Sequence, residues 1–510
     1  MADLVIGSGP TGVAVAAALL ARGRKVVMID GGKVLEPQGL ARQAALAARD
    51  PAGLTAADRA TWQAPQYAGP PGQVRRYGSD FAMEPVEATF AEAGGVALRS
   101  SRAIGGLSNL WGAAVLPYRQ QDMAGWPITA DDLAPHYRAV AALMPICGPT
   151  DALSPLFPAF AAPDHPALAA SPQGGALLRR LADQRDALSR TGCFAGAARV
   201  AVRPACHHCG LCLHGCPWNH IFSSRSALAG LARSARFEHR PGGVVRAFRE
   251  DQAGVVVHLA AGAELRAERL FIAAGVLETA RILLASHPDT PELILLDSQQ
   301  AFLPMLHRWR APVRPDQPPH TTLPQLFVEI DDKAISPFTV HGQIYSWNEY
   351  YQRDLMASYG RKLPGTAALW RALSRRLMVA QLFLHSDHSA RIALRLSGDG
   401  RLTALATPGA DAGPVMRKAM ARMAAAMGRG GMLTLPMASR TGAAGASFHT
   451  GGTVPMAMSP AKGQSDRLGR PRGLSRVHVA DASTFPGIPA TTITFSAMAN
   501  AHRIGTLAPD

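Results

Sequence analysis

One histidine near the C-terminus stands in a setting suited to proton chemistry. The segment SFHTGGTVPM carries His449 in a glycine-flanked turn. A neutral imidazole, with a reference pKa of about 6.5, can accept a proton from a hydroxyl group. Further along, a predicted strand at Val477–Ala480 ends in Asp481, and Ser483 precedes a Pro-Gly-Ile-Pro turn that leads into an apolar helix. This order of elements predicts one half of a cofactor site.

A glycine-rich unit at the N-terminus predicts the other half. The motif G-x-G-x-x-G is filled by Gly7, Gly9 and Gly12. Leu4–Ile6 before it is a predicted strand, Thr11–Ala21 a predicted helix, and Lys25–Ile29 a second strand that ends at Asp30. The glycines permit a tight turn and a close approach to a pyrophosphate, and the acid is placed for a ribose hydroxyl. The unit therefore predicts dinucleotide binding.

Four of the six cysteines lie together in ACHHCGLCLHGCP, residues 205–217: Cys206, Cys209, Cys212 and Cys216. Their spacing, C-x2-C-x2-C-x3-C-P, is that of the run that binds iron–sulfur clusters in bacterial ferredoxins. Disulfides are disfavoured between such close cysteines, and a four-cysteine zinc site usually needs two separated pairs. A metal-free loop is the alternative. In ferredoxins the fourth cysteine of such a run binds a second cluster. A single cluster in this chain would therefore need Cys216 itself or Cys193 as its fourth ligand, or it would hold only three irons. The type of the cluster, 3Fe-4S or 4Fe-4S, stays open. The histidines within the loop, His207, His208 and His214, also leave it open.

Taken together, these features resemble the glucose–methanol–choline (GMC) family of flavin oxidoreductases. Three stretches add to the resemblance: RAIGGLSNLWGAAVLPYR (102–119), similar to the flavin-covering loop; RLFIAAGVLETARILLAS (269–286), similar to the strand and helix that return to the cofactor; and GGVVRAF (242–248), similar to the strand near the adenine. They occur in the family's order. The resemblance implies an α/β fold, with a discontinuous Rossmann-like FAD-binding domain and an interleaved α+β substrate domain on a mostly antiparallel sheet.

The resemblance also implies which residues bind FAD. In the dinucleotide unit they are Gly7, Gly9, Pro10, Thr11, Gly12 and Asp30. In the flavin-covering loop they are Gly105, Gly106, Ser108, Asn109 and Trp111. In the later segments they are Val245, Ala274, Gly275, Asp481, Thr491 and Thr492. The stretch SNLW at 108–111 has no counterpart of the histidine that holds the flavin covalently in some relatives, so non-covalent FAD is expected.

For catalysis, the resemblance points to the C-terminal segments. His449, in H-x-x-G-T, matches the family's catalytic histidine. The family's second active-site residue, an Asn or His in a later turn, has no counterpart, because this chain reads PATT at 489–492. Either Thr491 or Thr492 helps to orient the substrate, or His449 works alone. Structural roles are expected for His385 and His388.

The length of 510 residues fits a large two-domain enzyme, and 47% hydrophobic and 17% charged residues are typical of a globular protein. We predict that residues 1–116, 193–284 and 435–510 form the FAD-binding domain, with the Cys-rich loop at 205–217. Residues 117–192 and 285–434 are predicted to form the substrate domain. Within the latter, Phe327–Ile330 and Ser389–Leu396 are predicted strands, and Pro414–Met427 and Thr366–Leu382 predicted helices.

The net charge of +15 arises mostly from arginines, and no nucleic-acid module accompanies them. No nucleic-acid partner is therefore expected. The first predicted strand begins at Leu4, which leaves no room for a secretory signal, and no apolar run is long enough to span a bilayer. We expect a cytoplasmic protein without a transmembrane segment.

The resulting hypothesis is an FAD-dependent dehydrogenase that oxidises a CH–OH group of a polyol or other sugar-like alcohol. Its electrons would pass, through an iron–sulfur cluster if the loop holds one, to an external acceptor or redox partner. Two alternatives stay open. One is an oxidase that uses dioxygen and has a structural Cys loop. The other is a redox-neutral lyase or binding protein with structural FAD.

Overall fold

Five parallel strands form the sheet around the N-terminal unit, and all but the edge strand β5 are mostly buried. The computed structural model describes residues 2–63, 79–160, 165–308, 320–348, 356 and 365–509. The strand order is β20 (Val477–Val479), β9 (Leu270–Ile272), β1 (Asp3–Ile6), β2 (Val26–Asp30) and β5 (Phe237–Pro241). All pairings are parallel. Short apolar runs such as β1 and β9 suit this position because helices cover both faces of a parallel sheet.

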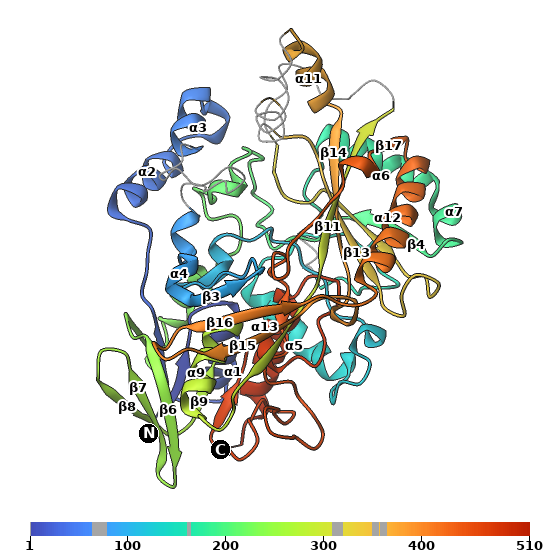
Figure 1. The fold of residues 1–510 in the computed structure, drawn as a ribbon. Helices are drawn as coiled ribbons and strands as arrows, with labels where there is room; N and C mark the ends of the chain where they lie inside the picture. Colours follow the sequence, from blue (N-terminus) through green and yellow to red (C-terminus); the bar gives the residue numbers. More distant parts are fainter. Residues whose placement is uncertain are drawn as a thin grey trace.

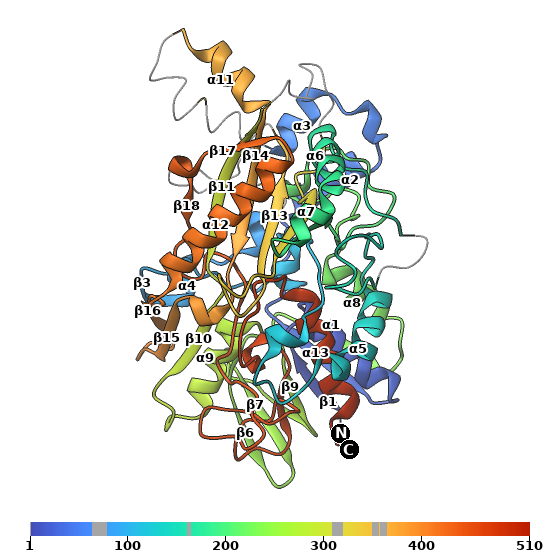
Figure 2. The same cartoon turned by 90° about the vertical axis from the view of Figure 1, so that its right-hand side faces the viewer.

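Two helices pack closely against this sheet and against each other. α1 (Pro10–Ala21) and α13 (Thr494–Leu507) lie side by side in both ribbon views (Figures 1 and 2). Gly505 permits this approach, because a Cβ there would lie 2.9 Å from the carbonyl oxygen of Val15. The predicted helix Thr11–Ala21 is present as α1, and α13 packs directly on it.

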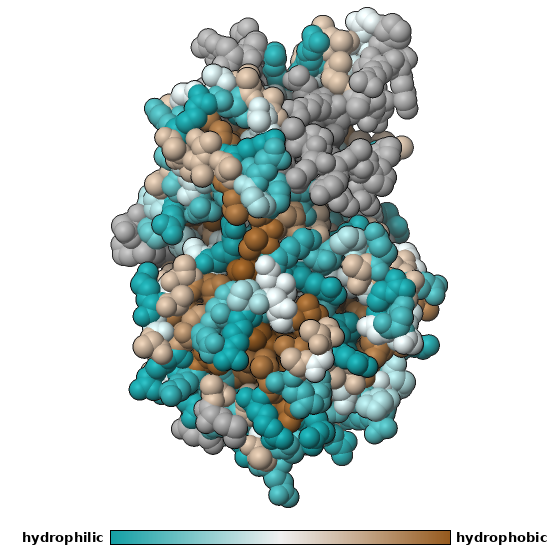
Figure 3. Space-filling model, turned by 90° about the vertical axis from the view of Figure 1, so that its left-hand side faces the viewer, coloured by the Kyte–Doolittle hydropathy of each residue, from teal (hydrophilic) through white to brown (hydrophobic). Residues whose placement is uncertain are grey.

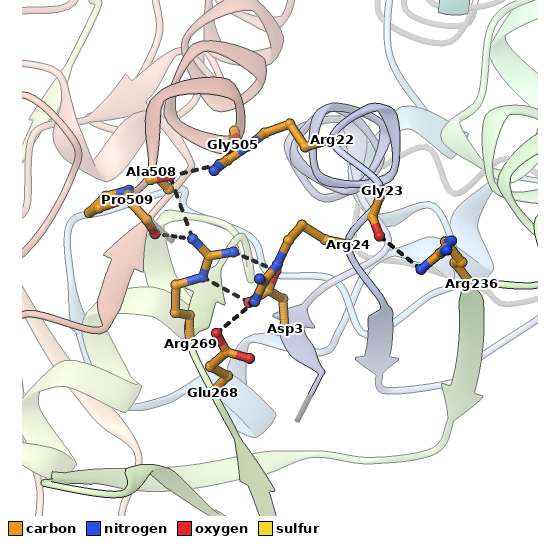
Figure 4. A network of polar contacts seen from close by, with 10 residues as sticks. All are labelled: Asp3, Arg22, Gly23, Arg24, Arg236, Glu268, Arg269, Gly505, Ala508 and Pro509. Carbon is orange, nitrogen blue, oxygen red and sulfur yellow. Dashed lines mark hydrogen bonds and ion pairs between the residues drawn. The ribbon is translucent and has the colours of Figure 1, made fainter.

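A buried ion-pair network fixes this packing near the chain ends (Figure 4). Arg269 donates two hydrogen bonds to the Asp3 carboxylate, at 2.9 and 2.8 Å, and Arg24 adds a third at 3.0 Å. Arg22 reaches the end of α13 through the carbonyl oxygen of Ala508, at 2.7 Å. The side chain of Asp3 is fully buried, so its charge depends on these partners.

The second large sheet has seven strands and is entirely antiparallel in its pairings. Its main path runs β17 (Met432–Thr434), β11 (Gln300–His307), β14 (Leu377–Phe383), β13 (Val340–Tyr345), β12 (Leu326–Ile330) and β4 (Cys193–Ala197), and β18 (Arg440–Thr441) pairs with β11. One face is apolar and is covered by α12 (Ala412–Arg429) and α6 (Pro172–Asp183). The fit is tight, since a Cβ on Gly342 would lie 2.4 Å from the terminal methyl of Met423.

The remaining strands form two smaller sheets. One contains β3 (Phe90–Gly94), β16 (Leu402–Thr407), β15 (Arg391–Leu396), β10 (Leu293–Asp297) and β19 (Thr450–Gly451). The other contains β6 (Val245–Asp251), β7 (Gly254–Leu259) and β8 (Glu264–Ala267). The other described α-helices are α2 (Pro37–Ala47), α3 (Ala56–Gln63), α4 (Val86–Thr89), α5 (Ala130–Leu143), α7 (Arg185–Ser189), α8 (Ser224–Leu231), α9 (Val276–Ser286) and α11 (Ala367–Ser374).

The predicted fold class is confirmed, because a Rossmann-like parallel sheet and a separate antiparallel sheet are both present. The domain boundaries remain a proposal; β4, at the start of the second proposed cofactor segment, pairs with β12 of the antiparallel sheet. The predicted helix Thr366–Leu382 is wrong in its second half. α11 ends at Ser374 and β14 begins at Leu377, because this segment fills the place between β11 and β13. In the part of the chain that the structure describes, no helix is long and apolar enough to cross a membrane.

Candidate active site

A cavity opens at the carboxyl ends of the parallel strands, where α/β sheets of this kind bind nucleotides. Its walls are formed by the glycine turn (6–11), the end of β2 (30–31), much of the loop from 98 to 107, the residues leading into β6 (243–245), the turn into α9 (273–278), and C-terminal residues near 448, 481 and 494. These segments come from all parts of the sequence. Figure 3 shows one face of the molecule on which hydrophobic surface continues inward between hydrophilic rims.

The three glycines of the N-terminal motif have different physical roles. A Cβ on Gly7 would lie 2.3 Å from the carbonyl oxygen of Ala273, and a Cβ on Gly12 only 1.9 Å from that of Gly7. Protein packing therefore requires both. A Cβ on Gly9 would meet no atom within 4 Å, so this position keeps space clear inside the cavity. The helix that follows has no side-chain cap, which leaves its first N–H groups for a ligand. These features fit the pyrophosphate of FAD.

Asp30 lies on the cavity wall, as predicted for a ribose-binding acid. Its carboxylate accepts hydrogen bonds from the Ser8 hydroxyl, from the backbone N–H of Gly32 at 2.9 Å and from His239 Nε2 at 3.1 Å. The side chain is thus held in place before any ligand binds.

In the predicted flavin-covering loop, some residues line the cavity and others hold the loop in shape through hydrogen bonds. Gly106 lines the cavity, and a Cβ on it would lie 3.5 Å from the Cα of Gly9. Ser108 donates to the carbonyl oxygen of Gly105 at 2.6 Å, and Asn109 donates to that of Ile104 at 2.9 Å. Trp111 is anchored by a hydrogen bond of 2.8 Å to the backbone of Phe222. Gly105, Ser108, Asn109 and Trp111 therefore hold the loop in shape and are not among the residues that line the cavity.

The later predicted cofactor residues surround the turn into α9. Val245, Ala274, Gly275 and Asp481 all line the cavity. The Asp481 carboxylate accepts from the backbone N–H of Gly275 at 3.0 Å and from the Thr279 hydroxyl at 2.6 Å. Burial raises the pKa of Asp481, while these hydrogen bonds act in the opposite direction. Asp481 thus joins the C-terminal segment to the helix N-terminus at the cavity.

His449 lies where the cofactor cavity meets the antiparallel sheet. Its neighbours in sequence, Phe448 and Thr450, line the cavity. The imidazole stacks on Phe383 of β14, with ring centroids 4.7 Å apart and an angle of 20°. Burial, and secondarily the charge of His341, lower the pKa of His449 to about 3. Its Nδ1 is buried and has no hydrogen-bond partner within the described residues. The structure thus places a half-buried imidazole, with a lowered pKa and a buried Nδ1, beside the cavity.

The two threonines of the C-terminal turn are buried and do not line the cavity. The Thr492 hydroxyl accepts a hydrogen bond from the backbone N–H of Leu116 at 2.7 Å, which gives it a clear structural task. The Thr491 hydroxyl has no partner among the described residues. Thr491 is therefore the more available of the two for a ligand, and its role remains a prediction.

The sequence analysis missed the polar face of the antiparallel sheet. Two rows of side chains share the face opposite α12: Glu329, His341, Phe383 and Gln300, then Phe327, Gln343, Gln381 and Phe302. This face looks toward the C-terminal segment, because Phe383 stacks on His449 and Gln300 donates to the carbonyl oxygen of Ala446 at 3.0 Å. Alternation in β13, VHGQIY, was the available signal. These residues form a polar wall next to the proposed base.

The cysteine loop does not support the predicted iron–sulfur site. Cys206, Cys209, Cys212 and Cys216 are free thiols, and in the described part of the chain no three His, Cys, Asp or Glu side chains converge as metal ligands. Cys209 packs on the apolar cluster that contains Trp62, whereas Cys206 and Cys212 pack on the main core of the molecule. The four thiols nevertheless lie close enough to interact electrostatically with one another.

The parallel sheet, the glycine-lined cavity and the neighbouring histidine form a site suited to a dinucleotide cofactor and a base. The family model described as GMC oxidoreductase matches residues 404–501. The fold is similar to that of pyridoxine 4-oxidase from Mesorbium loti, with a TM-score of 0.62 and 14% identity over 99% of this chain and 98% of that chain. No curated protein matches the chain in sequence. Residues 404–501 thus match the GMC oxidoreductase family, which implies FAD as the cofactor, and this match together with the fold supports an enzyme that acts on CH–OH donors.

Proposed function

We propose that this enzyme is an FAD-dependent dehydrogenase that oxidises a CH–OH group of a polyol or other sugar-like alcohol and passes the electrons to an external acceptor. The observation that carries the proposal is the position of His449, half-buried and with a lowered pKa, between the cofactor cavity and the polar wall of the sheet. An alcohol bound there has a base for its hydroxyl proton beside the site proposed for the flavin.

The polar wall supports a hydroxyl-rich, uncharged substrate. Gln381 donates to Gln300, and the Tyr345 hydroxyl donates to Gln343 at 2.6 Å, so the wall presents amide and phenol groups. Such groups donate and accept hydrogen bonds and suit several hydroxyl groups at once. Of the eight residues in the two rows, only Glu329 and His341 ionise, and these two are paired with each other.

Each residue then has a defined part in the reaction. Bound FAD would accept a hydride from the carbinol carbon. His449 takes the hydroxyl proton, which a neutral imidazole can do. The stacked Phe383 fixes the plane of the imidazole and excludes water from one side of it. Asp481 keeps the turn into α9 in place at the cavity wall.

The test is anaerobic reduction of the flavin by glucose, sorbitol, glycerol and pyridoxine, followed by absorbance. We expect one of them to bleach the flavin. His449→Ala should retain FAD and lower the rate of bleaching by about 10²–10⁴-fold. Unchanged bleaching in this variant would remove His449 from the mechanism, and a flavin that no alcohol reduces would favour a redox-neutral function.

A second candidate is an oxidase that uses dioxygen. It is favoured by the structural similarity to pyridoxine 4-oxidase, which also places pyridoxine in the substrate panel. Oxygen consumption during turnover, compared with reduction of an artificial dye, distinguishes the two. Rapid dye reduction with little oxygen uptake supports the dehydrogenase.

The iron–sulfur cluster remains a separate proposal that rests on the cysteine spacing alone. Iron and acid-labile sulfide in anaerobically purified protein would support it, and their loss in Cys209→Ser or Cys212→Ser would assign the ligands. Protein without iron would leave the loop a structural element. The cytoplasmic location likewise stays a prediction.

A further inference from the structure

A buried carboxylate–imidazole pair lies in the polar wall. Glu329 and His341 stand directly opposite each other on β12 and β13. Nδ1 of His341 and Oε1 of Glu329 are 2.7 Å apart, and both side chains are 0% exposed. The mechanism described so far gives this pair no task.

The pair lies close to the proposed base. His341 is directly opposite Phe383 on the neighbouring strand, and the two rings are 5.9 Å apart. Phe383 also stacks on His449, with ring centroids 4.7 Å apart. One aromatic ring therefore contacts both imidazoles, and a charge on His341 acts on His449.

The pair leaves two buried hydrogen-bonding atoms without a partner within the described residues, Oε2 of Glu329 and Nε2 of His341. Nε2 of His341 is buried and unbonded within the described residues. Buried polar groups normally have partners, so such an atom marks a place for a ligand or a water molecule. His388 gives an internal contrast: its Nδ1 pairs with Asp411 at 2.7 Å, and its Nε2 pairs with the Ser336 hydroxyl at 3.0 Å. In His388, unlike His341, both ring nitrogens therefore have partners.

Because the pair is buried, it can be inferred whether Nε2 of His341 carries a proton. An isolated charge is very unfavourable in such a place, so the pair as a whole is neutral. It is neutral both as carboxylate with imidazolium and as carboxylic acid with imidazole. In both forms the hydrogen bond to Glu329 uses Nδ1, and Nε2 carries a hydrogen. Nε2 of His341 is therefore a hydrogen-bond donor wherever the shared proton lies.

We propose that His341, held by Glu329, is a second catalytic residue that donates a hydrogen bond from Nε2 to the substrate oxygen. This inference rests on the proposed function. His449 takes the O–H proton as the C=O bond forms, and FAD, when bound, would supply the acceptor for the carbinol hydrogen and its electron pair. His341 keeps its proton throughout and stabilises the negative charge that develops on oxygen. Preorganised donors of this kind typically contribute about 10²–10³-fold in rate.

The experiment compares variants in anaerobic stopped-flow reduction, with the alcohol of the panel above (glucose, sorbitol, glycerol or pyridoxine) that reduces the wild-type flavin fastest. His341→Phe keeps an aromatic ring but no donor, and should lower the limiting rate by about 10²–10³-fold. His341→Gln restores an N–H donor and should recover part of this loss. His388→Gln is the matched control and should reduce at the wild-type rate. FAD content and melting temperature are measured for every variant.

A large loss in His341→Phe, partial recovery in His341→Gln and unchanged FAD content support the proposal. Wild-type limiting rates in both His341 variants would overturn it, as would equal losses in both together with lower melting temperatures, which would show a structural pair. If His341→Phe does not fold, the limiting rates of the two single variants Glu329→Gln and His341→Gln are compared with that of the wild type, and wild-type rates in both would overturn the proposal. If no alcohol reduces the wild-type flavin, the proposed function is refuted and this inference with it. That outcome is seen in the wild type before any variant is compared, so it cannot be confused with a failure of the His341 proposal alone.

Discussion

The unusual environment of His449 leads to a specific prediction about pH. In a solvent-exposed site its imidazole would titrate near 6.5, but burial lowers the pKa to about 3. Only the neutral form can accept the hydroxyl proton. The reaction should therefore lose its base only when the pH falls toward 3, and not when it passes through 6.5.

The size of the difference follows from the two pKa values. At pH 5 a histidine with the ordinary pKa of about 6.5 is only about 3% neutral, which lowers the rate about 30-fold relative to pH 8. With a pKa of about 3, His449 is about 99% neutral at pH 5 and the rate should be nearly unchanged.

The assay is the limiting rate of anaerobic flavin reduction between pH 5 and 8, with an alcohol that does not itself ionise. The same pKa shift affects stability. Between pH 6.5 and about 3 the unfolded chain binds a proton at His449 that the folded chain does not bind, so stability falls as the pH falls through this range. Tryptophan fluorescence at each pH verifies that the protein is folded.

A drop of about 30-fold with an inflection near pH 6.5 in folded protein would refute this reasoning, because it would show a solvated base. The residual rate of His449→Ala serves as the control, since it should not share an inflection that belongs to His449.

Three further predictions concern the cofactor domain. Asp30→Ala should weaken FAD binding by about 1.5–3 kcal/mol through loss of a charge-assisted hydrogen bond, measured by flavin fluorescence titration; unchanged affinity would exclude the ribose contact. Asp3→Asn should lower the free energy of unfolding by about 3–5 kcal/mol, because Arg269 is left buried without its partner charge; a change below about 1 kcal/mol in chemical denaturation would contradict the network's role. Gly9→Ala should weaken FAD binding by about 1–3 kcal/mol and spare the apoprotein, whereas Gly12→Ala should destabilise the apoprotein itself, because its Cβ would lie 1.9 Å from a backbone oxygen. Equal melting temperatures of the two apoproteins would contradict this distinction.

The elements that the sequence predicted well are those with local signals. The first strand, the glycine turn, the helix that ends at Ala21 and the strand that ends at Asp30 appear as β1, α1 and β2. Each depends on a short apolar run or on glycines whose conformation is set within a few residues. The predicted helix Pro414–Met427 is likewise present as α12, because its apolar residues recur with helical spacing.

The C-terminal site was predictable from the sequence in part. His449 and Asp481 were identified from their motifs, and both lie at or beside the cavity. The lowered pKa of His449 was not predictable, because it depends on burial against Phe383. The bracing role of Thr492 was also hidden, since its partner Leu116 lies far away in the sequence.

Tertiary structure alone decided three features. Leu377–Phe383 became β14, although its sequence continues an amphipathic helical pattern, because a strand there completes the sheet between β11 and β13. The thiols of the cysteine loop lie close together, but among the described residues no three His, Cys, Asp or Glu side chains converge as metal ligands, although the spacing allows it. Glu329 and His341 met because the register of β12 and β13 places them opposite each other. Apolar periodicity and glycine turns act over a few residues, so the sequence expresses them directly. Burial, strand register and side-chain convergence depend on segments distant in the chain, and only the folded molecule determines them.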